Sequence, residues 1–218
     1  MSQMVPADNA NPYEFYDMPA WQRQFAKPVG TIGSLVGCLM AMKNRKLQDF
    51  AVEILDIQPD DRVLEIGFGP GVALRMIAAK AWRGFVTGVE VSDVMISQAS
   101  RRNRRAIREG RLELKLASVS MLPYEDGTFT KVAAINAFQF WPNPYADLVE
   151  VKRVIATGGL LVICLRTAHP KPGKLTAPGF TESEVEGIVR LVKSVGFRDV
   201  GTARRKYGRD LACVHGKA

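Results

Sequence analysis

Cysteine and histidine are scarce in this chain of 218 residues, and their scarcity excludes several kinds of site. The three cysteines, Cys38, Cys164 and Cys213, are odd in number and stand far apart, and the chain has two histidines. Since no Cys-x-x-Cys pair or Cys/His group has the spacing of a metal site, we expect no bound metal. The same cysteine usage favours a reducing, cytoplasmic setting.

Acidic side chains are also in the minority, because 22 Asp or Glu face 30 Lys or Arg, which gives a net charge of +8. The excess lies in residues 101–115, with seven basic and two acidic side chains, and in residues 198–218, with six and two. Such a patch can attract an anionic partner. Proteins that bind RNA usually stack its bases on aromatic side chains, however, and residues 101–115 contain no aromatic residue. A solvated helix face is therefore the simpler interpretation, and a nucleic-acid partner is the minor alternative.

Long apolar runs are missing as well. Residues 28–42 carry no charge, but fifteen residues are too few to span a bilayer. Their apolar side chains recur at helical spacing, which is compatible with a helix on the core, a lid over a ligand or an interfacial membrane anchor. We expect residues 1–44 to form a helical lid segment and residues 45–218 to form one domain. Asp8 is the one charged residue among the first twelve, so a secretory signal is not expected.

Helical and strand patterns alternate from about residue 45 onward, as they do in a doubly wound parallel sheet. Strands are predicted at 62–66, 85–90, 112–117, 131–136, 160–165, 199–203 and 210–215. Helices are predicted at about 45–55, 72–81, 93–110, 145–155 and 181–195. Ser92 is an expected N-cap, and Thr181 with Glu184 forms an expected capping box.

A glycine-rich turn follows the first of these strands and precedes a helix, in the segment Val-Leu-Glu-Ile-Gly-Phe-Gly-Pro-Gly at 63–71. Glycine is needed where a turn demands positive φ or where a ligand approaches the main chain. A dinucleotide fingerprint would place its third glycine at position 72, but Val72 stands there and the glycine is Gly71. The spacing therefore fits a ligand without a pyrophosphate better than a dinucleotide.

Four segments in order resemble the class I S-adenosylmethionine-dependent methyltransferases, and the chain is similar to the ubiquinone and menaquinone biosynthesis (methyltransferase type 11) group over about residues 45–215. They are the glycine segment from Glu65, the Gly-Val-Glu of 88–90, the Leu-Pro-Tyr segment within 121–129 and residues 150–159. The resemblance implies a Rossmann-like fold: a doubly wound, seven-stranded, mostly parallel sheet with an antiparallel last strand and an N-terminal helical lid. It also implies an enzyme that uses S-adenosylmethionine as its cofactor.

The resemblance assigns cofactor contacts residue by residue. Glu65 is expected near the methionine amino group, Glu90 at both ribose hydroxyls and Val91 on the adenine. Ser118 stands where relatives commonly have an acid that accepts from the adenine amino group, so this contact is weakened. The full expected set is Glu65, Gly67, Phe68, Gly69, Gly71, Glu90, Val91, Ser118, Val119 and Asn136.

The acceptor side is expected in the segment after the fourth strand, residues 136–144. Its aromatic side chains Phe138, Phe140 and Trp141 could face a sulfonium or an apolar acceptor, although at least one should simply pack under the next helix. Tyr16 and Trp21 are further candidate acceptor contacts in the N-terminal segment.

Methyl transfer from a sulfonium is an in-line displacement that needs alignment more than proton transfer, so a base is optional. His169 follows the fifth strand and is by position the candidate imidazole base, whereas the last strand should carry His215 to the other edge. Asn136 and Gln139 could orient an acceptor without taking a proton.

The predicted function is methyl transfer to a small-molecule acceptor by a cytoplasmic monomer or homodimer. Two alternatives remain open: a membrane-associated enzyme acting on lipid headgroups through peripheral contact, and an RNA-modifying or RNA-binding methyltransferase. We expect the arginine-rich helix on the outer face, away from the acceptor pocket. The basic turn at 204–209 is compatible with an anionic substrate.

Overall fold

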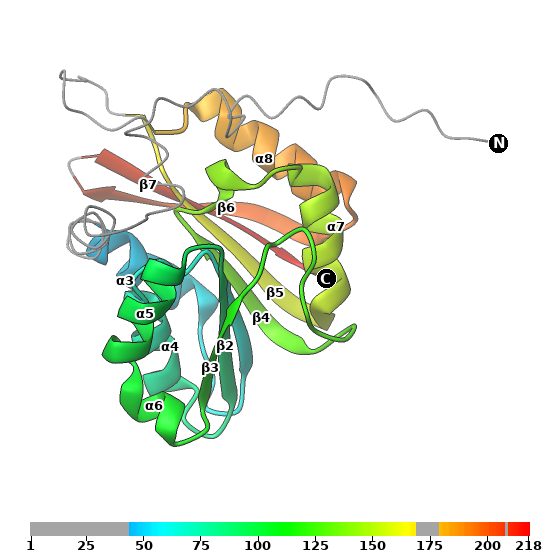
Figure 1. Ribbon diagram of the computed structural model, residues 1–218. Helices are drawn as coiled ribbons and strands as arrows, with labels where there is room; N and C mark the ends of the chain where they lie inside the picture. The colour runs from blue at the N-terminus through cyan, green and yellow to red at the C-terminus, as the bar shows by residue number, and fades with distance from the viewer. Residues whose placement is uncertain (1–43, 169–178, 208) are drawn as a thin grey trace.

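A computed structural model describes residues 44–168, 179–207 and 209–218, which form a twisted sheet with helices on both faces (Figure 1). The seven strands lie in the order β3-β2-β1-β4-β5-β7-β6. Their bounds are β1 Arg62–Ile66, β2 Phe85–Glu90, β3 Leu112–Leu116, β4 Phe129–Ile135, β5 Ile155–Arg166, β6 Arg198–Tyr207 and β7 Arg209–Lys217.

The sheet has the expected strand directions. Strands β3, β2, β1, β4 and β5 pair in parallel, while β7 runs antiparallel to both β5 and β6. The predicted doubly wound, seven-stranded, mostly parallel sheet with an antiparallel last strand is therefore confirmed. Because parallel strands end at the same edge, the segments that follow β1, β2, β3 and β4 gather there, which is where ligands bind in such sheets.

The helices are α3 Arg45–Leu55, α4 Val72–Lys80, α5 Asp93–Arg102, α6 Arg104–Arg108, α7 Pro144–Val154 and α8 Glu182–Ser194, with a 3-10 turn η2 at Phe138–Phe140. Two apolar clusters divide them: α3, α4, α5 and α6 contribute to one, and α7 and α8 to the other. Figure 1 shows these two groups on opposite faces of the sheet.

Strand β5 explains why its sequence reads as a continuous apolar run. Leu161, Ile163 and Leu165 face the cluster of α7 and α8, whereas Val162 and Cys164 face the cluster of α3 and α4. All five side chains are fully buried. A central strand covered by helices on both sides has no solvent-facing positions, so no polar alternation is left in its sequence.

Two expected element boundaries are wrong. The single helix predicted from 93 to about 110 is broken at Asn103 into α5 and α6. Strand β5 begins at Ile155, directly after α7, and continues through Gly158 at φ +78°, where we expected a turn before the strand. The predicted caps are confirmed, since Ser92 accepts from Met95 N–H and Thr181 with Glu184 forms a capping box.

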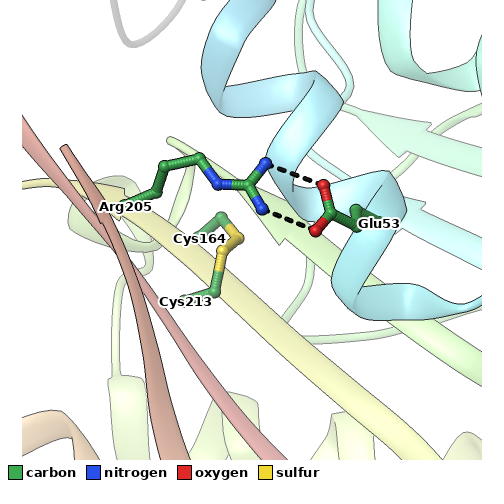
Figure 2. The surroundings of a disulfide bond; sticks show 4 residues. All are labelled: Glu53, Cys164, Arg205 and Cys213. Carbon is green, nitrogen blue, oxygen red and sulfur yellow. Dashed lines mark hydrogen bonds and ion pairs between the residues drawn. A yellow bond between two sulfur atoms is a disulfide. The ribbon is translucent and has the colours of Figure 1, made fainter. Parts of the chain in front are cut away.

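A disulfide joins Cys164 in β5 to Cys213 in β7, across the antiparallel pair (Figure 2). The two residues stand directly opposite each other, with Cα atoms 4.0 Å apart, and both side chains are buried. No local spacing predicts this pairing, because 49 positions separate the two cysteines. Disulfides persist mainly in oxidising compartments, so the cysteines no longer support a reducing setting.

The expected lid segment and the loop at 169–178 lie outside the described residues, and with them Tyr16, Trp21 and His169. The boundary between residues 44 and 45 stays a prediction, although α3 begins at Arg45. Among residues 44–168, 179–207 and 209–218, the structure contains no helix with the length and apolar character of a membrane span.

Candidate functional site

The glycine-rich turn joins β1 to α4 at the carboxyl edge of the sheet. Gly67, Gly69 and Gly71 all have positive φ, at +68°, +52° and +73°. Gly71 is the N-cap of α4 in a left-handed conformation. Non-glycine residues rarely adopt such angles, so the three glycines set the path of this turn.

The three glycines differ in the space that surrounds them. A Cβ on Gly67 would lie 2.6 Å from Cβ of Ala137, and one on Gly71 would lie 2.6 Å from Cβ of Ala99. A Cβ on Gly69 would meet no atom within 4 Å. The turn is therefore pressed against its neighbours at both ends and open at Gly69.

Phe68 contributes to the turn in a different way from the glycines. Its side chain is buried and lies so close to Gly88 in β2 that a Cβ there would stand 2.4 Å from the ring. Because the ring is part of the core beneath the turn, Phe68 can offer a ligand its backbone only.

Glu65 in β1 is a buried carboxylate next to this turn. A hydrogen bond from the backbone of Leu74, in the first turn of α4, reaches it, but its Oε2 is buried without a hydrogen-bond partner among the described residues. Burial, reinforced by the neighbouring Glu90 carboxylate, raises the pKa of Glu65 to about 8. An orphaned buried carboxylate oxygen points to a cationic or hydrogen-bond-donating ligand.

Glu90 ends β2 and is bound to the same turn. Its Oε2 accepts from the N–H of Gly69 at 3.0 Å, and its Oε1 accepts from Val91 at 2.8 Å and Ser92 at 3.1 Å. Burial raises the pKa of Glu90, while these backbone donors work in the opposite direction. Each carboxylate oxygen has two lone pairs, so Oε2 can accept one more hydrogen bond from a ligand.

The segments after β2 and β3 form the next part of the edge. Ala117 N–H donates to the carbonyl of Glu90 at 3.1 Å, which ties the end of β3 to the end of β2. Val91 is 41% exposed, whereas Val119 is buried. The hydroxyl of Ser118 accepts from Ser120 N–H at 3.2 Å and donates to the Ser120 hydroxyl at 3.4 Å. An exposed apolar side chain thus stands beside a small polar turn.

Residues 136–141 follow β4 and lie against the glycine turn through Ala137. Asn136 has φ +54°, and its N–H donates to the carbonyl of Cys164 at 2.8 Å. Gln139 Nε2 donates to the carbonyl of Asn136 at 2.9 Å, and its Oε1 is buried without a partner in the described part of the chain. Two neutral amides therefore flank Ala137, the residue that contacts the glycine turn, and one of them has an unused acceptor.

The three aromatic residues of this segment differ in placement. Phe138 and Trp141 are buried in the core on the α7 side, with ring centroids 5.0 Å apart. Phe140 is partly exposed. Packing thus accounts for two of the three rings, and Phe140 is the one with surface left for a ligand.

The edge of the sheet also receives the start of β7. Arg166 at the end of β5 pairs with Leu211, and Thr167 N–H donates to the carbonyl of Asp210 at 3.1 Å. The first residues of β7 therefore lie at the carboxyl end of β5. His215 pairs with Val162, well back from this edge, as we expected.

Sequence reasoning missed two residues that contact the glycine turn. Asn103 Nδ2 donates to the carbonyl of Gly71 at 3.0 Å, and Arg102 Nη1 donates to the carbonyl of Pro70. Most of the neighbouring arginines are exposed, as expected of an outer face, so nothing in the sequence singles out Arg102. The Asn at the helix break was the one available signal.

The arrangement fits S-adenosylmethionine. Its amino group and sulfonium are cationic, which suits the unpartnered oxygen of Glu65, and the open space at Gly69 leaves room for a ligand on the main chain. In the described part of the chain, no three His, Cys, Asp or Glu side chains are grouped to hold a metal ion.

Comparison with known proteins points to one family. A methyltransferase-domain family model matches residues 64–163, which run from β1 into β5. This match and the methyltransferase relatives support a class I S-adenosylmethionine-dependent methyltransferase. The uncharacterized methyltransferase YdaC of Bacillus subtilis (strain 168) is 25% identical over 166 residues, which cover 76% of this methyltransferase and 87% of the relative.

Two further comparisons concern an acceptor-specific relative and the fold. The 27-O-demethylrifamycin SV methyltransferase of Amycolatopsis mediterranei (strain S699) is 30% identical over 149 residues, which cover 67% of this chain and 54% of the relative. The crystal structure of a SAM dependent methyltransferase from Aquifex aeolicus matches with a TM-score of 0.69 at 19% identity, over 84% of this chain and 97% of that one. The latter likeness supports the methyltransferase fold.

Proposed function

We propose that this methyltransferase transfers a methyl group from S-adenosylmethionine to a small-molecule acceptor, with the cofactor held between the glycine turn, Glu65 and Glu90. The observation that carries the proposal is the buried Oε2 of Glu65, which has no hydrogen-bond partner in the described structure. A buried carboxylate without a partner is costly, and a cationic ligand removes that cost.

The proposed cofactor contacts follow the geometry of the edge. Glu65 receives the amino group, and the main chain at Gly67, Phe68, Gly69 and Gly71 lines the cofactor. Glu90 accepts from one ribose hydroxyl through the lone pair of Oε2 that the Gly69 N–H leaves free. Val91 and Val119 supply apolar contact to the adenine, and Ser118 lies at the edge of the adenine ring. Asn136 lies at the methionine side of the cofactor.

Bound S-adenosylmethionine supplies an activated methyl group, so the residues of the chain mainly align the acceptor with it. Asn136 and Gln139 orient the acceptor; the buried, unused Oε1 of Gln139 suits an acceptor with a hydroxyl or amine hydrogen. Phe140 gives apolar contact, because packing in the core occupies Phe138 and Trp141, and Tyr16 and Trp21 complete the set. Neutral amides take no proton, so any base comes from elsewhere, and His169 is the candidate.

A small, amphiphilic acceptor is supported by the names of relatives that act on a rifamycin and on sterols. A monomer or homodimer, with peripheral membrane contact at most, completes the proposal; the expected cytoplasmic location is the part of it that the Cys164–Cys213 disulfide opposes. Incubation of the enzyme and labelled S-adenosylmethionine with metabolite extract, anionic vesicles and total RNA as separate arms identifies the acceptor class. Label in the small-molecule fraction supports the proposal, and label confined to lipid or RNA overturns it.

Cofactor binding is tested by calorimetry with S-adenosylmethionine and S-adenosylhomocysteine. The natural chain should bind both, Glu65→Gln should bind at least ten-fold more weakly, and Glu113→Gln should match the natural chain. Glu113 is a suitable control because it is an exposed glutamate on β3, which β2 separates from the strand of Glu65. Failure of the natural chain to bind either compound, or unchanged binding by Glu65→Gln, contradicts the proposed site.

A further inference from the structure

Asn103 stands at the break between α5 and α6 and faces the glycine turn. Its side chain is buried, with 4% exposure. Its Nδ2 donates two hydrogen bonds, to the carbonyl of Ala99 at 2.9 Å and to the carbonyl of Gly71 at 3.0 Å. One amide group therefore joins the last turn of α5 to Gly71, the N-cap residue of α4.

Its neighbour Arg102 binds Pro70, the residue before Gly71 in the same turn. Arg102 Nη1 donates to the carbonyl of Pro70, and the side chain is partly buried. Two consecutive residues of one helix end thus hold two consecutive carbonyls of the turn. Neither contact involves the open side of the turn at Gly69.

The turn needs such support because its three glycines permit many conformations. Gly69 and Gly71 are held at positive φ by few contacts of their own: Gly69 N–H donates to Glu90, and Gly71 N–H donates to the carbonyl of Phe68 at 3.0 Å. A glycine loses more conformational freedom on ordering than any other residue. Hydrogen bonds from α5 reduce the cost of ordering that a ligand would otherwise meet on binding.

We infer that Asn103 is a positioning residue for the cofactor, which keeps the glycine turn in its binding conformation by holding the Gly71 carbonyl, with Arg102 as a second support at Pro70. The inference rests on the proposed role of the turn in cofactor binding. Asn103 touches no ligand in this scheme and acts through the backbone of the turn alone.

Two variants test the inference by calorimetry with S-adenosylhomocysteine. Asn103→Ala removes both donors and should weaken binding about ten-fold, which corresponds to the net contribution of one well-placed hydrogen bond. Arg104→Ala, the matched control, changes the adjacent exposed residue and should bind like the natural chain. Thermal unfolding of each variant establishes that it is folded.

Asn103→Asp adds a measurement that a merely structural role would not move. The side chain keeps its shape, but only its protonated form can donate a hydrogen bond to Gly71. Burial beside two carbonyl oxygens should raise the pKa of this acid, so the ratio of its Kd to that of the natural chain should be smallest at low pH and rise above about ten-fold as the acid ionises. Comparison with the natural chain at each pH cancels the titration of Glu65.

The outcomes separate the inference from the proposed function. Folded variants that bind S-adenosylhomocysteine as tightly as the natural chain, with a pH-independent Kd ratio, overturn the role of Asn103 while the cofactor site stands. A natural chain that fails to bind either S-adenosylhomocysteine or S-adenosylmethionine overturns the proposed function and the inference together.

Discussion

Arg205 in β6 and Glu53 in α3 form a two-pronged ion pair over the disulfide of the sheet (Figure 2). The distances are 2.7 Å from Nη1 to Oε2 and 2.5 Å from Nη2 to Oε1, and 152 positions separate the two residues. The guanidinium also lies 4.5 Å from the ring centroid of Phe50. Arg205 thus covers an apolar side chain as well as pairing with a carboxylate.

Arg205→Ala should lower the melting temperature more than Glu53→Gln, because it removes the cover over Phe50 in addition to the ion pair. Thermal unfolding at low and high salt measures both effects. The small deficit of Glu53→Gln should shrink at high salt, since exposed pairs are screened, whereas that of Arg205→Ala should largely persist. Equal losses in the two variants would show that the contact with Phe50 contributes nothing.

The disulfide predicts a defined thiol count and a stability loss on reduction. Alkylation of the unfolded, unreduced chain should modify one cysteine, Cys38, and alkylation after reduction should modify three. Cys164→Ala together with Cys213→Ala should lose about 2–4 kcal/mol of unfolding free energy relative to the oxidised chain, because the unfolded state gains freedom. Three modified cysteines without reduction are the contrary result.

Glu65 predicts how cofactor affinity changes with pH. With its pKa raised to about 8, the carboxyl is protonated at pH 7 in the free protein, whereas a cationic ligand favours the ionised form. Binding therefore releases a proton, and S-adenosylmethionine affinity should rise by up to ten-fold per pH unit below about pH 8 and level off above it. Calorimetry in buffers of different ionisation enthalpy measures the released proton.

The same pKa predicts an opposite trend for the stability of the free protein. Between the ordinary carboxyl pKa of 4.5 and about 8, the folded state holds a proton that the unfolded state has lost, so unfolding free energy falls as pH rises through this window. Glu65→Gln should remove this slope and should melt higher than the natural chain near pH 9, even though it binds cofactor poorly. A stability difference that does not vary with pH would contradict the raised pKa.

Alanine substitutions in the glycine turn should separate ligand space from folding. Gly69→Ala and Gly110→Ala place alanine at similar positive φ with no atom within 4 Å of the new Cβ, so both should cost about 1 kcal/mol of stability. Binding assays with S-adenosylhomocysteine should distinguish them, because only Gly69 lies in the cofactor turn. Loss of affinity in both variants, or in neither, would count against a ligand at Gly69.

Gly71→Ala supplies the contrast within the turn. Its Cβ would stand 2.6 Å from Cβ of Ala99 and 2.8 Å from Nδ2 of Asn103, so α5 must move away. The expected result is a larger drop in melting temperature than for Gly69→Ala, measured by thermal unfolding without ligand.

Much of the cofactor edge could be predicted from the chain because its signals are local. The glycine spacing, Glu65 before it and Glu90 at the end of the next strand are each specified within a few residues, and parallel pairing brings strand ends together at one edge. The caps at Ser92 and Thr181 were equally local. The aromatic segment does follow β4, but which of Phe138, Phe140 and Trp141 stays accessible depends on packing from α7.

The remaining features depend on residues that meet from distant parts of the chain. The Cys164–Cys213 disulfide requires the β5–β7 register, and the hold of Asn103 on Gly71 requires α5 to pack against the turn. The raised pKa of Glu65 follows from complete burial beside Glu90, which no spacing in the sequence expresses. Periodicity and turn chemistry determined the succession of helices and strands along the chain and the glycine turn after β1. Burial and contacts between separate elements, which exist only once the chain is folded, decided the charge state of Glu65 and the support of the turn.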